Sequence, residues 1–179
     1  WDDDRKASAF VTARDDQVML FSGNLHASMS NEFRTGLSHE LQLSMLMFDG
    51  LAEHGIVYQT DPSSSYFDFS QDRLAVDYLQ FPRQTLAFRN GDCDDLSVLY
   101  SALLEAVGVP AAFITTPGHI FVGVWLNTTE DEARRTFLFP DDLIYTDSGE
   151  VWLPVEVTAL RGTFLEAWSL GARQWREAD

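Results

Sequence analysis

The residues best suited to covalent chemistry gather around the single cysteine of the chain, Cys93. It stands in the run RNGDCDDL (89–96), where a Gly-Asp turn precedes a strongly one-faced helical pattern. A lone cysteine cannot form an internal disulfide, so Cys93 is a small buried hydrophobe, an incidental surface residue or a reactive thiol. Because unpaired N–H groups at a helix N-terminus favour a thiolate, this position favours the reactive thiol.

A cysteine nucleophile needs a base, and the base needs a group that orients it. Among the four histidines, His119 differs because it begins an apolar strand pattern directly after Pro117-Gly118. The other three are expected near the surface. Strand alternation puts His119 on the same face as Phe121, Gly123 and Trp125. His119 is therefore the candidate base, and a structural histidine bonded to backbone is the alternative.

The candidate orienting group is Glu156, the one charged residue in the apolar run VWLPVEV (151–157). Burying an unpaired carboxylate is costly, and an imidazolium on the neighbouring strand would supply the partner that it needs. The alternative is an exposed glutamate on an edge strand, which needs no partner.

The pattern of apolar residues and caps predicts the elements that position these groups. A helix is expected over 38–54 with Ser38 as N-cap and Gly55 as its stop, and another over 93–107 with Asp92 and Asp95 as a capping box. Strands are expected over 10–11, 17–21, 111–116, 119–126, 137–139, 143–145 and 151–157, with an edge or bulge at Pro154. A closing helix is expected over 163–175. Helices followed by antiparallel strands indicate an α+β fold.

Four segments in this order resemble the core of a transglutaminase-like domain: GDCDDL (91–96), LEAVGVPA (104–111), PGHIFV (117–122) and WLPVEVT (152–158). The family is similar in fold to papain-type enzymes, so the resemblance implies a cysteine-bearing helix packed on an antiparallel sheet. It implies Cys93 as nucleophile, His119 as general base and Glu156 as third member of a triad. The third position of the family is more often Asp, which is one methylene shorter.

We therefore expect a single transglutaminase-like domain over 1–179. Its core spans 75–158, an N-terminal region of strand and helix spans 8–55, and the C-terminal helix spans 163–175.

An oxyanion hole is also required, and the backbone N–H of Cys93 can supply one donor. Gln80 is the candidate for the second donor, with Tyr78 as its alternative, although a surface glutamine is the commoner explanation. The aromatic residues of the polar segment 59–73 either edge a cleft or fold back onto the core.

Three carboxylates crowd the thiol, those of Asp92, Asp94 and Asp95. They suit a helix start but repel a thiolate and raise its pKa. Carboxylate oxygens are ligands that calcium prefers, and some relatives of the family bind calcium near the active site. Calcium is therefore a candidate cofactor at these three residues, and helix capping with solvated charge is the alternative. No other cofactor or metal is expected.

Charge and composition exclude several functions. The chain has 12 basic and 28 acidic residues and a net charge of −16, which argues against binding nucleic acid or anionic lipid. No apolar run is long enough to insert into a membrane. The chain opens at Trp1 without an initiator methionine, so we expect a mature or excised form. One cysteine fits a reducing compartment or a bacterial envelope, and we favour a periplasmic or extracellular location.

The leading interpretation is a cysteine-dependent amide acyl hydrolase or transferase, protease-like or transglutaminase-like, that uses a thioester intermediate on a protein or peptide substrate. The alternative is a weak or inactive module on the same fold that binds a peptide or protein partner, with or without calcium modulation. The oligomeric state is open.

Overall fold

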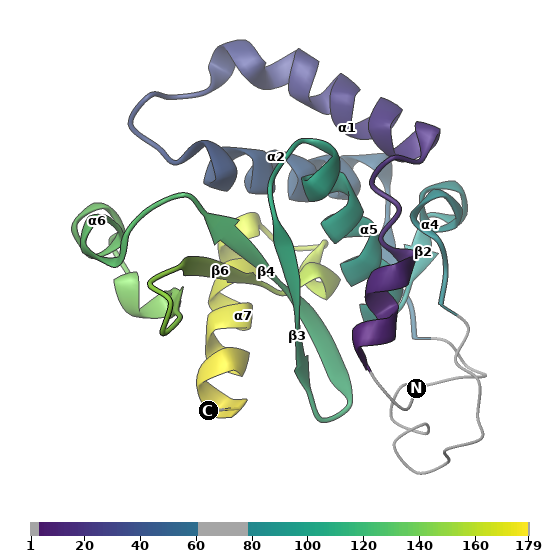
Figure 1. Cartoon of the computed structure of the whole chain (residues 1–179). Helices are drawn as coiled ribbons and strands as arrows, with labels where there is room; N and C mark the ends of the chain where they lie inside the picture. Colours follow the sequence, from purple (N-terminus) through teal and green to yellow (C-terminus); the bar gives the residue numbers. More distant parts are fainter. Residues whose placement is uncertain (1–3, 61–78, 179) are drawn as a thin grey trace.

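A computed structural model describes residues 4–60 and 79–178 of the chain (Figure 1). The helices are α1 (Asp16–Met29), α2 (His39–His54), α4 (Pro82–Phe88), α5 (Cys93–Ala106), α6 (Glu130–Thr136) and α7 (Phe164–Ala178). The strands are β1 (Val57–Tyr58), β2 (Asn90–Gly91), β3 (Ala111–Thr116), β4 (His119–Leu126), β5 (Ile144–Tyr145) and β6 (Val151–Val155). Short 3-10 helices are η1 (Asp4–Phe10), η2 (Ser30–Glu32), η3 (Pro140–Asp142) and η4 (Val157–Ala159).

Four strands form an antiparallel sheet in the order β3-β4-β6-β5. β4 lies between β3 and β6, as its apolar residues on both faces predict, and its bounds match the predicted strand. β5 is shorter than predicted, and no strand forms over 137–139. Pro154 lies past the two β6 residues that β5 pairs, so it leaves no gap in that ladder.

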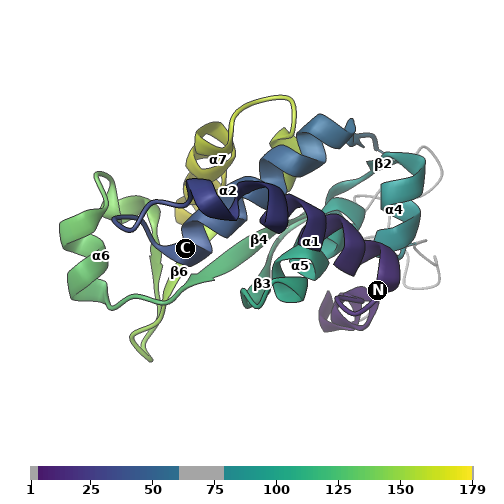
Figure 2. The ribbon, with the colours of Figure 1, turned by 90° about the horizontal axis from the view of Figure 1, so that it is seen from above.

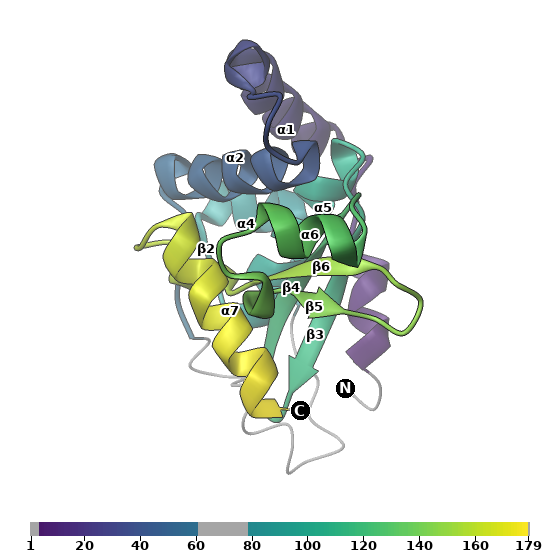
Figure 3. The same ribbon diagram turned by 90° about the vertical axis from the view of Figure 1, so that its left-hand side faces the viewer.

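α5 packs against one side of this sheet, and its first three turns are buried along almost their whole length. Leu96, Leu99 and Leu103 belong to the same buried apolar cluster as Val122 and Val124 of β4. α1 and α2 lie over the outer side of α5, as Figures 1 and 2 show. α7 packs against β6 and crosses the direction of that strand, as Figure 3 shows. The predicted α+β arrangement, with a cysteine-bearing helix on an antiparallel sheet, is confirmed.

The second helix is confirmed in its caps as well as its length. The Ser38 side chain accepts a hydrogen bond from the Leu41 amide at the start of α2. Gly55 ends it with φ of 84°, a left-handed conformation that glycine adopts at little cost.

The strands predicted near the N-terminus are wrong. Residues 10–11 fall at the end of η1 and just after it, and residues 17–21 lie inside α1. The run Val-Met-Leu-Phe looked like a strand because it is continuously apolar. In the structure Val18 is buried while Met19 and Leu20 are exposed, which is the pattern of one face of a helix. No helix or strand is predicted over 127–136, but the structure forms α6 there, which Thr129 and Glu132 cap.

Within the described part of the chain, no helix is long and apolar enough to cross a membrane.

Candidate active site

Cys93 is the first residue of α5 and is 5% exposed. The helix start is held by the predicted capping box, in which the Asp92 side chain accepts from the Asp95 amide and the Asp95 side chain accepts from the Asp92 amide. Gly91 precedes the box, and a Cβ at that position would lie 2.6 Å from Cβ of Asp95. The glycine therefore lets the chain enter the helix close to the Asp95 side chain.

The surroundings of the thiol oppose its ionisation. Burial, followed by the negative charges of Asp94 and Asp92, raises the pKa of Cys93 to about 12. A hydrogen bond from the Ile120 backbone works in the opposite direction. The resting thiol is therefore protonated at neutral pH. The contact with Ile120 also shows that the start of α5 lies against the start of β4.

His119 is the first residue of β4, and its ring is paired with Glu156. Nε2 of His119 lies 2.5 Å from Oε2 of Glu156, and the ring stacks on Phe121 with centroids 6.2 Å apart. This contact occupies Nε2 and leaves Nδ1 as the other ring nitrogen. The predicted shared face of His119 and Phe121 is thereby observed.

Glu156 follows β6 directly and is 3% exposed, so it is not an exposed edge glutamate. Its Oε1 accepts from the amide of Thr158 at 3.0 Å and from the Thr158 hydroxyl at 2.6 Å. Burial works to raise the pKa of Glu156, but the hydrogen bond and charge of His119 and the Thr158 donors outweigh it and lower the pKa. The carboxylate is therefore ionised, with one oxygen facing His119 and the other fixed by Thr158.

Thr158 has no assigned role in the sequence interpretation. The available signal is its spacing, because a hydroxyl two residues after a carboxylate can bond back to that carboxylate. The signal is weak alone, since it gains meaning only when Glu156 is known to be buried beside an imidazole.

Gln80 lies at the start of α5 but its donors are engaged there. Its backbone N–H and its Nε2 donate to the two oxygens of Asp95, each at 2.7 Å, and Nε2 also reaches the Asn90 carbonyl at 3.4 Å. Its Oε1 is buried and has no hydrogen-bond partner. The oxyanion role of Gln80 stays a prediction, and it requires that Nε2 leave Asp95. Tyr78 and the aromatic residues Tyr66, Phe67 and Phe69 lie outside the described residues.

Asp92, Asp94 and Asp95 are all buried, and one oxygen from each lies within 4.8 Å of the others. Both Asp95 oxygens accept hydrogen bonds from Gln80, and burial is the largest cause that raises the pKa of Asp95 to about 7. These oxygens already serve helix capping and the bond to Gln80, so a calcium ion would have to replace hydrogen bonds at the start of α5. No step of the chemistry below uses calcium, which stays a prediction of the sequence.

The remaining histidines lie away from this site. His26 and His39 contact each other and Phe33 through their rings, with 6.3 Å between the two histidine centroids. His39 is exposed, as predicted, whereas His26 and His54 are partly buried. His54 has its Nε2 3.3 Å from the Leu86 carbonyl.

The cysteine lies at the start of a helix that packs on an antiparallel sheet, and the neighbouring strand β4 begins with a carboxylate-paired histidine, within an α+β fold. Comparison with known sequences identifies the class. The sequence model of the transglutaminase-like superfamily matches residues 55–157, more than half of the chain, and the chain belongs to that superfamily. The matched region begins at Gly55, just after α2, and closes immediately after Glu156.

A similar curated protein is the UPF0252 protein PH1321 of Pyrococcus horikoshii, which is 24% identical over 119 residues. The match covers 59% of this chain and 35% of that protein, so the chain spans about a third of its relative. No solved structure matches this chain significantly.

Proposed function

We propose that this chain is a cysteine-dependent acyl hydrolase or transferase that acts on amide bonds of a peptide or protein. The observation that carries the proposal is the contact between His119 and Glu156. A carboxylate that is almost fully buried is costly unless it is paired, and its partner here is the imidazole of His119, whose neighbour in β4, Ile120, bonds to Cys93 through its backbone. That pairing fixes the ring orientation that a general base requires.

In the proposed reaction, Nδ1 of His119 accepts the thiol proton of Cys93 as the sulfur attacks the amide carbonyl carbon. A C–S bond forms, the carbonyl oxygen becomes negative, and the backbone N–H of Cys93 donates to it. Collapse of this intermediate breaks the C–N bond, and the amine leaves with the proton held by His119. The acyl group remains on Cys93 as a thioester until water or a second amine attacks it.

The raised pKa of Cys93 decides the timing of the first step. A thiol that is protonated at rest transfers its proton to His119 during the attack rather than before substrate arrives. Glu156 then lies beside the imidazolium that forms, and its negative charge stabilises that cation.

A second function is favoured by the same raised pKa and by the burial of the thiol. On this alternative the chain binds a peptide or protein partner without turnover, and Cys93 is a core residue. The three aspartates also lead us to propose that calcium modulates this binding. Calorimetry with calcium on the wild type and on Asp94→Asn would test this, and no heat of binding would contradict it.

Alkylation by iodoacetamide separates the two functions. Labelling of Cys93 in the wild type is expected to exceed labelling in His119→Ala by at least about tenfold, because the ring accepts the thiol proton. His39→Ala, which removes an exposed histidine of α2, serves as the matched control and should label like the wild type. Equal labelling of wild type and His119→Ala would show that Cys93 and His119 do not act as a catalytic pair.

Turnover is then measured by release of new amino termini from a denatured protein substrate, with and without an added primary amine. Absence of both products, together with labelling that does not depend on His119, would favour the binding module.

A further inference from the structure

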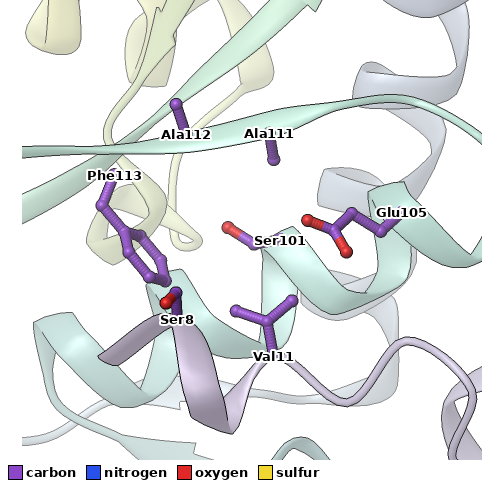
Figure 4. A pocket seen from close by; sticks show the side chains of 7 residues that line it. All are labelled: Ser8, Val11, Ser101, Glu105, Ala111, Ala112 and Phe113. Atoms are coloured by element: carbon purple, nitrogen blue, oxygen red, sulfur yellow. The ribbon is translucent and has the colours of Figure 1, made fainter. Parts of the chain in front are cut away.

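A cavity of about 190 Å³ lies on the side of α5 away from α2, between η1 and strand β3. Figure 4 shows Ser101 and Glu105 of α5 pointing into it, with Ala111 and Phe113 on the strand side and Ser8 and Val11 opposite. Ala112 points away from the cavity, as strand alternation requires. The cavity is far along α5 from Cys93, because Ser101 lies two turns and Glu105 three turns beyond the helix start.

The strand that borders this cavity has an open edge. β3 is the outermost strand of the sheet, and no strand within 4–60 or 79–178 pairs with its other side. The Trp125 amide donates to the Pro110 carbonyl, and β3 pairs residue by residue with β4 from that point. In an antiparallel ladder only alternate residues bond to the partner. Ala111, Phe113 and Thr115 therefore direct their N–H and C=O groups outward, and the first two of them line the cavity.

One polar side chain of the cavity lacks a hydrogen-bond partner among the described residues, whereas the Ser8 hydroxyl donates to the Arg5 carbonyl. Ser101 is 3% exposed, and its hydroxyl has no hydrogen-bond partner. Such a buried hydroxyl costs free energy unless a ligand or water meets it. Glu105 reaches the same space, and burial raises the pKa of its carboxyl. The basic residues of η1, Arg5 and Lys6, are not among the side chains that line the cavity.

We propose that an extended peptide segment with a lysine side chain binds along the open edge of β3, with the lysine in this cavity. The peptide backbone adds a strand by pairing with the outward groups of Ala111 and Phe113. The aliphatic stem of the lysine lies on Val11 and Phe113, and its ammonium meets the Glu105 carboxylate and the Ser101 hydroxyl.

Charge complementarity identifies the partner. A chain with net charge −16 attracts a basic segment and repels a second copy of itself, so the occupant comes from a different, basic partner. The binding does not depend on chemistry at Cys93, so it is separable from the proposed enzymatic function.

The test uses the fluorescent peptide acetyl-Thr-Val-Lys-Val-Thr-amide and the Cys93→Ser protein, with binding followed by fluorescence anisotropy. Saturable binding is expected. Glu105→Gln should weaken it about fivefold by removing the charge partner. Glu177→Gln removes one charge from the exposed end of α7 and is the matched control, with no change expected.

Two altered peptides test the two halves of the proposal. Replacing the lysine by glutamate should abolish binding. N-methylation of the lysine and the C-terminal threonine amides should weaken it at least tenfold, because in an antiparallel pair the residues on the lysine's face direct their N–H groups toward β3. Absence of saturable binding by the original peptide would overturn the proposal. Equal affinity for the glutamate or the N-methylated peptide, or for wild-type and Glu105→Gln protein, would also overturn it.

Discussion

Nε2 of His119 and Oε2 of Glu156 lie 2.5 Å apart, which joins the first residue of β4 to the residue that follows β6. The third member of the proposed triad is expected to be aspartate more often than glutamate. Here the longer side chain reaches the imidazole while Thr158 holds its second oxygen. The extra methylene is therefore accommodated by the turn after β6.

Replacing Glu156 tests whether this pair orients the ring. Glu156→Gln keeps the size of the side chain but removes its charge, so His119-dependent labelling of Cys93 should fall about 100-fold. The loss of a charge-assisted hydrogen bond should also lower the free energy of unfolding by about 1.5–3 kcal/mol, measured by urea denaturation. Labelling within twofold of the wild type would contradict the role of Glu156.

Replacing Thr158 tests how the carboxylate is positioned. Thr158→Val keeps the shape and the backbone N–H but removes the hydroxyl that donates to Oε1 at 2.6 Å. Labelling of Cys93 should slow about five- to tenfold, in line with the loss of one hydrogen bond to a charged group. Thr158→Ser restores the hydroxyl and should recover the wild-type rate. If Thr158→Ser labels as slowly as Thr158→Val, the loss comes from packing and not from the hydroxyl. If Thr158→Val labels at the wild-type rate, the hydroxyl is dispensable.

The pH dependence of Cys93 alkylation reports the charge around the thiol. Because its pKa is raised to about 12, the thiolate fraction grows as pH rises, and the rate in His119→Ala should increase about tenfold per pH unit between pH 7 and 10. Asp94→Asn removes a negative charge that raises this pKa, so it should speed labelling at pH 8. Asp147→Asn, in the exposed turn before β6, is the control of equal charge change. A rate in His119→Ala that is flat above pH 7 would contradict the raised pKa.

Two helical glycines test the packing of α7 on β6. A Cβ at Gly171 would lie 2.6 Å from the Pro154 carbonyl oxygen, which is backbone and cannot turn aside. Gly171→Ala should therefore lower the free energy of unfolding by about 1–3 kcal/mol. Gly23→Ala in α1 meets no atom within 4 Å and should raise it by about 0.5–1 kcal/mol, because alanine favours the helix. Urea denaturation of both variants gives the comparison, and stabilisation by Gly171→Ala would show that the helix does not pack this closely.

The sequence predicted elements whose signals are local. α5 carries its own cap at Asp92 and a long apolar face, and β3 and β4 are continuous runs joined by Pro117-Gly118, so all three lie where expected. The strand predicted over 17–21 is wrong because an apolar run alone does not show which of its residues are buried in the helix that forms there. That distinction depends on the helices against which α1 packs.

The residues of the candidate site also differ in whether local sequence signals predict them. Cys93 and His119 follow from their positions at the starts of a helix and a strand. The burial of Glu156 does not follow from its own strand, because the partners that make burial tolerable belong to β4 and to the turn at Thr158. The bond between Gln80 and Asp95 joins residues 15 positions apart and depends on how the chain enters α5.

The Asp95 carboxyl accepts hydrogen bonds from two parts of the chain. It caps the start of α5 through the Asp92 amide, and it accepts from Gln80 in the segment before α4. Its pKa of about 7 means that the carboxyl exchanges its proton within the range of ordinary assay buffers. Experiments at pH 6 and at pH 8 therefore compare two electrostatic forms of the start of α5, one with a neutral acid at Asp95 and one with an added negative charge there. Buffer choice becomes an experimental variable in its own right for every rate measured on this chain.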